Sequence, residues 1–210
     1  MSRYSNLSII GVIVIIVGVA GYYLLVNQQE SVPMDENMGA EPSDVASGDA
    51  VPIIDGVVDT NEYENSYSTN SGVNVYWETN GANLLVGLES PGKGWIAIGF
   101  DPDQAMRGAN YVFGYVADGA TFVSDEYGVS NFGHRPDTMD GGSDDILDYA
   151  GVETSELTII EFVIPLDSGD FQDKLLELGE TYSVLLAYNN SDDSFTSKHS
   201  RRDSFDMKIS

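Results

Sequence analysis

The sequence predicts an all-β domain of antiparallel sheets, arranged as a sandwich or a barrel, behind one N-terminal transmembrane helix. Roughly ten short runs rich in aromatic and branched residues follow one another at intervals of about 8 to 12 residues. Turn-forming pairs such as Asn80-Gly81 and Asp118-Gly119 stand between several of them. The long apolar run near the N-terminus carries no charged residue, which is typical of a membrane span.

That run is residues 7–26, LSIIGVIVIIVGVAGYYLLV. A helix of about 20 residues spans about 30 Å, which matches the hydrocarbon core of a bilayer. Tyr22 and Tyr23 suit the membrane interface, and Arg3 lies on the N-terminal side, so the positive-inside rule places the rest of the chain outside the cytoplasm. We therefore expect residues 1–26 to be a retained single-pass anchor in the cell membrane. A cleaved signal peptide is the alternative, although the run is longer than a usual signal core.

Residues 27–50 are polar and acidic, with two prolines and no apolar periodicity, and we expect a flexible linker there. The folded domain then covers residues 51–210. Its first half contains strand-like runs with turn formers between them. These are Ile53–Val58, Glu64–Thr69, Val73–Glu78, Ala82–Glu89, Gly94–Phe100, Ala109–Ala117 and Ala120–Tyr127.

The second half of the domain continues the same pattern and adds one helical candidate, Phe171–Leu178. Its expected strands are Asp145–Tyr149, Leu157–Leu166, Thr181–Asn189, Phe195–His199 and Phe205–Ile209. This regular succession of short strands favours a β-sandwich or barrel.

Composition excludes several classes of function. The chain has no cysteine, which excludes disulfides, thiolate-bound zinc, thiolate-bound iron–sulfur clusters and covalently attached c-type haem. The formal net charge is -25, from 34 acidic and 9 basic residues, and this excess argues against nucleic acid and against an anionic membrane surface as partners. An acidic, well-solvated surface suits high salt.

Met106 and His199 are the candidate cofactor ligands. Met106 is the only large apolar side chain in the polar loop between two predicted strands. His199 is followed by Arg201 and Arg202 in a chain with only nine basic residues. Methionine and histidine form an axial pair for low-spin haem, and arginine is well suited to the haem propionates. Such a pair leaves no open iron position, so it favours electron transfer; each residue alone would also be compatible with a structural role.

Other kinds of site have weaker signals. The sequence lacks the G-x-S-x-G pattern of a serine nucleophile elbow. The segment from Asp137 to Asp145 is rich in oxygen ligands and glycine, as calcium loops are, but it does not have the spacing of an EF-hand. Calcium is therefore a candidate without support from a motif.

Four segments together resemble a DOMON domain: GWIAIGF at 94–100, AMRGANYVFGYV at 105–116, HRPDTMDGGSDDIL at 134–147 and FTSKHSRRDSFDM at 195–207. The opening Asp55–Asp59, with Glu62-Tyr63, is also similar to the start of such domains. The resemblance covers residues 51–210 and implies an immunoglobulin-like β-sandwich that binds haem b or sugars. In its haem-binding branch, which includes the cytochrome domain of cellobiose dehydrogenase, the axial ligands are methionine and histidine. By motif these correspond to Met106 and His199, and His134 reads as structural or rim-lining.

We therefore expect a membrane-anchored, extracytoplasmic domain that binds haem b non-covalently and transfers electrons, rather than an enzyme. It would need a redox partner protein, which the sequence does not identify. The alternative is a non-redox surface module that binds carbohydrate or another small ligand. Its candidate aromatic platform consists of Tyr111, Tyr115, Tyr127 and Phe132.

Overall fold

A computed structural model describes residues 52–59 and 61–210 of the chain. The predicted anchor, residues 1–26, and the predicted linker, residues 27–50, lie outside the described residues. Within the part that is described, no helix has the length and apolar character needed to cross a bilayer.

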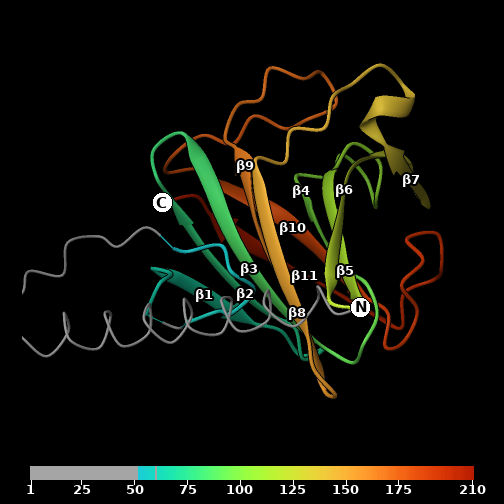
Figure 1. The fold of residues 1–210 in the computed structure, drawn as a ribbon. Coiled ribbons are helices and arrows are strands. Elements are labelled where there is room, and N and C mark those ends of the chain that lie inside the picture. Colours follow the sequence, from blue (N-terminus) through green and yellow to red (C-terminus); the bar gives the residue numbers. More distant parts are fainter. Residues whose placement is uncertain (1–51, 60) are drawn as a thin grey trace, which may run out of the picture. The chain divides into compact units, whose positions relative to one another are not determined.

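The domain consists of two antiparallel sheets, which confirms the all-β sandwich prediction (Figure 1). The five-stranded sheet has the order β1 (Asn65–Ser68), β2 (Asn74–Thr79), β3 (Asn83–Pro91), β9 (Leu157–Pro165) and β8 (Asp148–Glu153). The six-stranded sheet has the order β11 (Arg201–Lys208), β10 (Thr181–Tyr188), β4 (Ile96–Phe100), β5 (Asn110–Ala117), β6 (Ala120–Ser130) and β7 (Gly133–Pro136). In residues 52–59 and 61–210 the one helical element is a 3₁₀ turn, η1 (Asp137–Met139).

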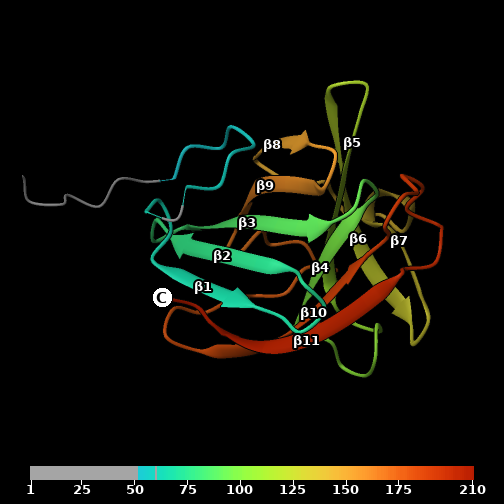
Figure 2. The ribbon, with the colours of Figure 1, turned by 90° about the horizontal axis from the view of Figure 1, so that it is seen from below.

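The main hydrophobic core lies between the two sheets, where alternate residues of each strand meet (Figure 2). Leu84 and Val86 on β3 and Phe162 on β9 enter it from one sheet. Ile98 on β4 and Leu186 on β10 are paired in register and enter it from the other. All five side chains are at most 2% exposed, so their packing holds the two sheets together.

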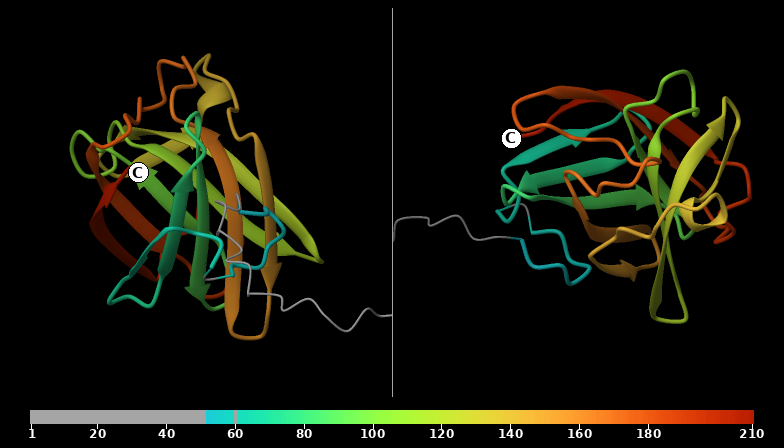
Figure 3. Two further views of the ribbon diagram at one scale, coloured as in Figure 1. Left: turned by 90° about the vertical axis from the view of Figure 1, so that its left-hand side faces the viewer. Right: turned by 90° about the horizontal axis from the view of Figure 1, so that it is seen from above.

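Contacts at both edges close the sandwich, and Figure 3 shows the strands of one sheet crossing in front of the other. At the first edge, the ring of Tyr67 on β1 stacks on Phe205 of β11 with 4.5 Å between centroids. The indole of Trp77 there donates to the carbonyl of Lys208 at 2.8 Å. At the opposite edge, the hydroxyl of Thr121 on β6 donates to the carbonyl of Gly151 on β8 at 3.2 Å.

Three sequence-based elements are wrong. Phe171–Leu178 is not a helix, and neither Ile53–Val58 nor Phe195–His199 is a strand. In the first segment, Phe171, Leu175 and Leu178 are exposed, while Gln172 and Leu176 are buried. The other two segments are irregular, and each lies against the outer face of a sheet rather than within it.

Glu161 on β9 anchors the N-terminal segment of the domain to the outer face of the five-stranded sheet. Its side chain has no exposed surface, and its carboxylate accepts from the Tyr63 hydroxyl at 2.6 Å and from the Gly56 amide at 2.7 Å. The Asp55 amide donates to it at 3.1 Å. Burial raises the pKa of Glu161, and these three hydrogen bonds oppose that rise because they favour the charged form.

We predict that Glu161→Ala destabilises the domain by about 3 kcal/mol or more, since three donors lose their acceptor and buried unpaired donors cost about 1–3 kcal/mol each. Tyr63→Phe removes one of the three bonds, and its cost should be about 1–2 kcal/mol. Urea unfolding followed by tryptophan fluorescence measures both. Glu156→Ala, an exposed glutamate in the β8–β9 turn, is the control and should change stability by less than about 0.5 kcal/mol. Equal effects of Glu161→Ala and Glu156→Ala would contradict the anchoring role.

Candidate functional site

The outer face of the six-stranded sheet carries a second apolar cluster, separate from the core between the sheets. The buried members are Trp95, Ala97, Ala109, Tyr111 and Phe113. The partly buried side chains packed against them are Met106, Tyr115, Leu185, Ala187 and Phe195. We call these ten residues the outer aromatic cluster. Because an exposed apolar sheet face is unfavourable in water, this face has to be covered by loops or by a ligand.

The loop between β4 and β5 places Met106 at this cluster. Asp103 and Arg107 close the loop, because the Asp103 amide donates to the Arg107 carbonyl at 2.9 Å. Ala105 has a φ of 53°, which turns the backbone just before Met106. The thioether side chain is partly buried against the cluster. Met106 therefore covers one margin of this apolar face.

Gly128 on β6 lets the Met106 loop approach the sheet. A Cβ at Gly128 would lie 1.8 Å from the Met106 carbonyl oxygen, far inside any allowed contact. The Gly108 amide donates to the Gly128 carbonyl at 2.8 Å, and the Gly128 amide donates to the Ala109 carbonyl at 3.0 Å. Gly128 therefore sets the position of the loop that carries Met106.

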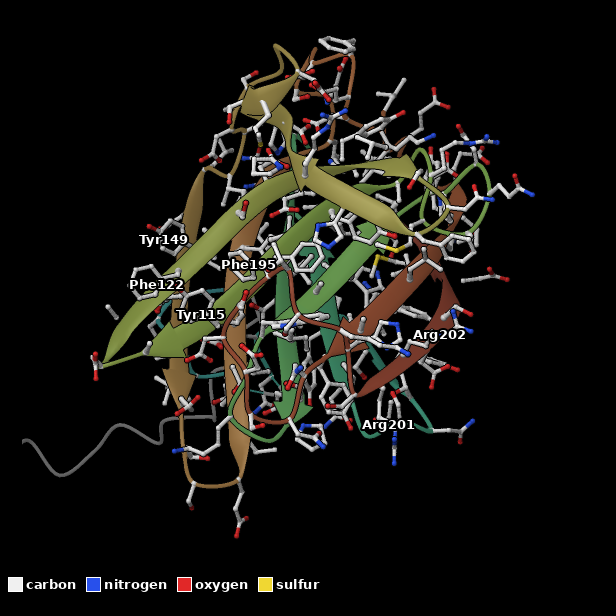
Figure 4. All side chains as sticks on the ribbon, turned by 90° about the vertical axis from the view of Figure 1, so that its right-hand side faces the viewer. Tyr115, Phe122, Tyr149, Phe195, Arg201 and Arg202 are labelled. Atoms are coloured by element: carbon white, nitrogen blue, oxygen red, sulfur yellow. The ribbon has the colours of Figure 1, made fainter. Side chains whose placement is uncertain are left out.

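The loop of residues 189–200, between β10 and β11, carries His199 and borders the same cluster. Its Phe195 packs edge-on against Phe113, with centroids 5.6 Å apart, and against Tyr115 at 5.0 Å. The indole of Trp95 donates to the Ser197 hydroxyl at 2.9 Å. Figure 4 shows Phe195 lying over the sheet.

His199 itself is half-buried. Burial lowers its pKa, and the positive charges of Arg202 and Lys198 lower it further. Its imidazole is therefore neutral at neutral pH, which is the form that binds a metal. In this respect His199 has the protonation state that an axial ligand needs.

The two predicted propionate partners lie on opposite sides of β11. Arg202 is paired with Ala187, a member of the outer aromatic cluster, so its side chain is on the cluster's side of the sheet. Arg201 is paired with Tyr188, whose side chain is in the core between the sheets. Both arginines are exposed, and Figure 4 shows them extending from β11. Only Arg202 shares a face with the cluster.

His134 on β7 also reaches the outer aromatic cluster. Its ring stacks on Phe113 with 4.3 Å between centroids, and it lies 6.2 Å from the ring of Tyr111. Its Nδ1 pairs with the carboxylate of Glu126, which is 3% exposed and also accepts from the Ser124 hydroxyl at 3.0 Å. The sequence indicated a rim-lining or structural role, but it had no signal for the contact with Phe113, because that contact depends on how β7 pairs with β6.

The aromatic residues proposed for a carbohydrate platform are not gathered into one surface. Tyr111 is 4% exposed, and Tyr127 is half-buried on the inner side of β6, opposite Asn110. Phe132 is 92% exposed in the β6–β7 turn. Tyr115 is the exception, because it stacks on the exposed ring of Phe122 with 4.8 Å between centroids. A shallow hollow near Gly119 and Gly151 lies at the other end of β5 from Met106.

A model of the DOMON domain matches residues 69–189. The chain belongs to the DOMON domain family. The matched part of the DOMON domain includes Met106 and His134 but ends before His199, Arg201 and Arg202. The family assignment from sequence is therefore confirmed, while the ligand roles of these residues stay predictions.

Curated relatives of this DOMON domain include DBH-like monooxygenase protein 1 of Homo sapiens, which is 34% identical over 116 residues. MOXD1 homolog 2 of Drosophila melanogaster is 23% identical over 130 residues. The matched regions cover 55% and 62% of this chain but only 18% and 17% of those relatives. The chain thus corresponds to less than a fifth of their length.

Two solved structures share the fold of this DOMON domain. One is the cytochrome domain of Myriococcum thermophilum cellobiose dehydrogenase, with a TM-score of 0.51, 10% identity and coverage of 70% of this chain and 79% of that one. The other is the cytochrome b domain of pyranose dehydrogenase from Coprinopsis cinerea, with a TM-score of 0.50, 10% identity and coverage of 68% and 80%. At this level of identity the similarity concerns the fold.

We predict that Gly128→Ala destabilises the DOMON domain by roughly 1–3 kcal/mol, because the added methyl group must push the Met106 loop off the sheet. Gly133→Ala in the same hairpin is the matched control. Its Cβ would meet only the flexible Ser130 side chain, at 3.1 Å, so its effect should be small. Thermal unfolding by circular dichroism measures both variants. Similar unfolding temperatures for the two would contradict the close approach at Gly128.

Proposed function

We propose that this DOMON domain binds haem b at the outer aromatic cluster, with Met106 and His199 as axial ligands, and acts in electron transfer. The observation that carries the proposal is that two loops with different ligand types border one apolar face. Met106 packs against the cluster from one loop. His199 lies in the other loop, shortly after Phe195 and Ser197, which contact the cluster. The fold shared with two cytochrome domains supports it.

The residues present fit such a group chemically. The aromatic cluster offers an apolar surface, Met106 offers a thioether, and His199 offers a neutral imidazole. Arg202 is free to meet a propionate on the same face, and it would act through its guanidinium fork. When bound, a haem would take up and release one electron reversibly. The residues around it would hold it, keep water from it and set its potential.

Phe195 determines how a flat group can enter this face. Its ring rests against Phe113 and Tyr115, so part of the surface is already covered by the protein. A macrocycle bound at this part of the face would meet the Phe195 ring. The loop of residues 189–200 carries both Phe195 and His199, so one segment would supply an apolar contact and an axial ligand.

Membrane anchoring is the second part of the proposal. The charge-free run at residues 7–26 supports a single-pass anchor, with the domain on the outer side of the cell membrane. In that position the domain would pass electrons to or from a partner protein outside the cytoplasm. The domain itself would be a carrier rather than an enzyme.

The haem proposal predicts that the purified chain, reconstituted with hemin, gives a Soret band that shifts on reduction. Met106→Ala and His199→Ala should each alter the band positions or lower hemin retention, because each removes one axial ligand. Absorption spectroscopy of oxidised and reduced samples measures this. Met139→Ala is the matched control, since Met139 is 68% exposed on η1 and should leave the spectrum unchanged. A wild-type chain without haem absorption, or variants identical to it, would refute the ligand assignment.

Carbohydrate binding is the second candidate, favoured by the stacked pair of Tyr115 and the exposed Phe122. Stacked aromatic rings with an open face can pack against a sugar ring. If this candidate is correct, Phe122→Ala should abolish binding in a glycan array, while Met106→Ala should not. Binding that survives Phe122→Ala, or no glycan binding by the wild type, would exclude the pair as the platform.

A further inference from the structure

Three aspartates from distant parts of the chain converge at one end of the sandwich. They are Asp125 on β6, Asp145 in the loop before β8 and Asp173 in the segment after β9. One carboxylate oxygen from each lies within 4.8 Å of the others. The loops of residues 137–147 and 166–180, which supply two of them, lie side by side at this end (Figure 1), and the Ser143 hydroxyl donates to Asp170 across them at 2.9 Å.

Buried polar atoms without a hydrogen-bond partner surround this cluster. Asp137 has no exposed surface, and neither of its carboxylate oxygens is hydrogen-bonded. Gln172 is 3% exposed, and its Oε1 is also unpartnered. One oxygen each of Asp125 and Asp173 is in the same state. Buried oxygens are normally satisfied, so this many unpartnered acceptors at one place fit the coordination of a cation.

Geometry and electrostatics place these extra oxygens at the cluster. A Cβ at Gly142 would lie 2.4 Å from Gln172 Oε1 and 3.1 Å from the Asp137 Cβ, so these two side chains are neighbours. Burial raises the pKa of Asp137 to about 7, and the charge of Asp173 raises it further. Burial likewise raises the pKa of Asp125 to about 8, with Asp173 and Asp137 adding to the rise. The carboxyl groups thus affect one another directly.

The described part of the chain supplies no cation to this cluster. Among residues 52–59 and 61–210, none of Asp125, Asp137, Asp145 and Asp173 takes part in an ion pair. The nearby Arg135 pairs with Asp140 at 2.7 Å, and Lys174 pairs with Asp103 at 3.1 Å. Buried carboxylates are normally paired or coordinate a metal, and pairing is absent for these four.

The donor set identifies the class of ion. All available atoms are oxygens, from carboxylates and one amide, and the cluster contains neither histidine nor cysteine. Such a set suits a hard cation rather than zinc or copper. Calcium accepts six to eight oxygens in irregular geometry, whereas magnesium requires a near-ideal octahedron and retains several waters. Side chains from three separate segments fit the requirement of calcium better.

We propose that Asp125, Asp145 and Asp173, together with Asp137 and Gln172, form a calcium site that ties the loop of residues 137–147 to the segment of residues 166–180. This site is independent of the proposed haem site. The sequence indicated the segment from Asp137 to Asp145 as a calcium candidate, but it gave no reason to include Asp125 or Asp173. The positive charge of the ion would offset the repulsion between the carboxylates, because they would all coordinate the same ion.

The test is calcium binding by the purified full chain, measured by isothermal titration calorimetry and by thermal unfolding with calcium or with EDTA. We expect one specific calcium ion per chain and an unfolding temperature several degrees higher with calcium. Asp173→Asn and Asp137→Asn should each weaken calcium binding at least about tenfold. In EDTA both variants should be as stable as the wild type or more stable, because each removes one repelling charge.

Asp167→Asn is the matched control, since it makes the same change of charge at an exposed position of the same segment. It should keep the affinity and the calcium-dependent shift of the wild type. Magnesium at the same concentration controls for screening of the acidic surface and should give a much smaller shift. The site is refuted if magnesium reproduces the shift, or if Asp173→Asn and Asp137→Asn bind calcium as the wild type does.

Discussion

The six-stranded sheet of this DOMON domain is apolar on both faces, and the arrangement of the candidate site depends on that. One face packs against the five-stranded sheet and forms the main core. The other carries Trp95, Tyr111 and Phe113, and within residues 52–59 and 61–210 no second sheet covers it. Apolar side chains of this size have to be removed from water. The β4–β5 loop, β7 and the β10–β11 loop therefore fold over this face, and they bring Met106, His134 and Phe195 against it.

The sequence predicted most strands of this sheet because they follow simple local patterns, but it did not predict β7 or the first half of β11. Gly94–Phe100 and Ala109–Ala117 were predicted as strands on apolar content, and β4 and β5 occupy nearly the same residues. Irregular segments were harder, since side-chain hydrogen bonds rather than periodicity determine them. In the β10–β11 loop, for example, the Asn189 side chain donates to the Ser197 hydroxyl at 3.3 Å and to the Lys198 carbonyl at 2.9 Å, which holds Phe195–His199 out of any strand.

The candidate ligands could be chosen from sequence only because the chain has so few of their kind. The chain has only two histidines and six methionines, so few residues of either kind had to be compared. The acidic cluster was hidden for the opposite reason: 34 acidic residues make every pair of carboxylates equally plausible in sequence. Asp125 and Asp173 are 48 positions apart, and only the topology of the sandwich brings them together. Rare residue types can thus be identified as site candidates from the sequence, whereas abundant types can be identified only once the fold shows which of them lie close together.

The hydrogen bonds at Glu161 set the point at which tension on the N-terminal segment would reach the sheets. Tyr63, Gly56 and Asp55 fasten the N-terminal segment to the outer surface of the five-stranded sheet. A pull on the chain from its N-terminal side would therefore strain β9 and its neighbours first. The six-stranded sheet lies across the main core from this attachment and would receive less of that tension. Tension on the N-terminal segment could in this way be borne by the five-stranded sheet without a change in the geometry of the six-stranded sheet.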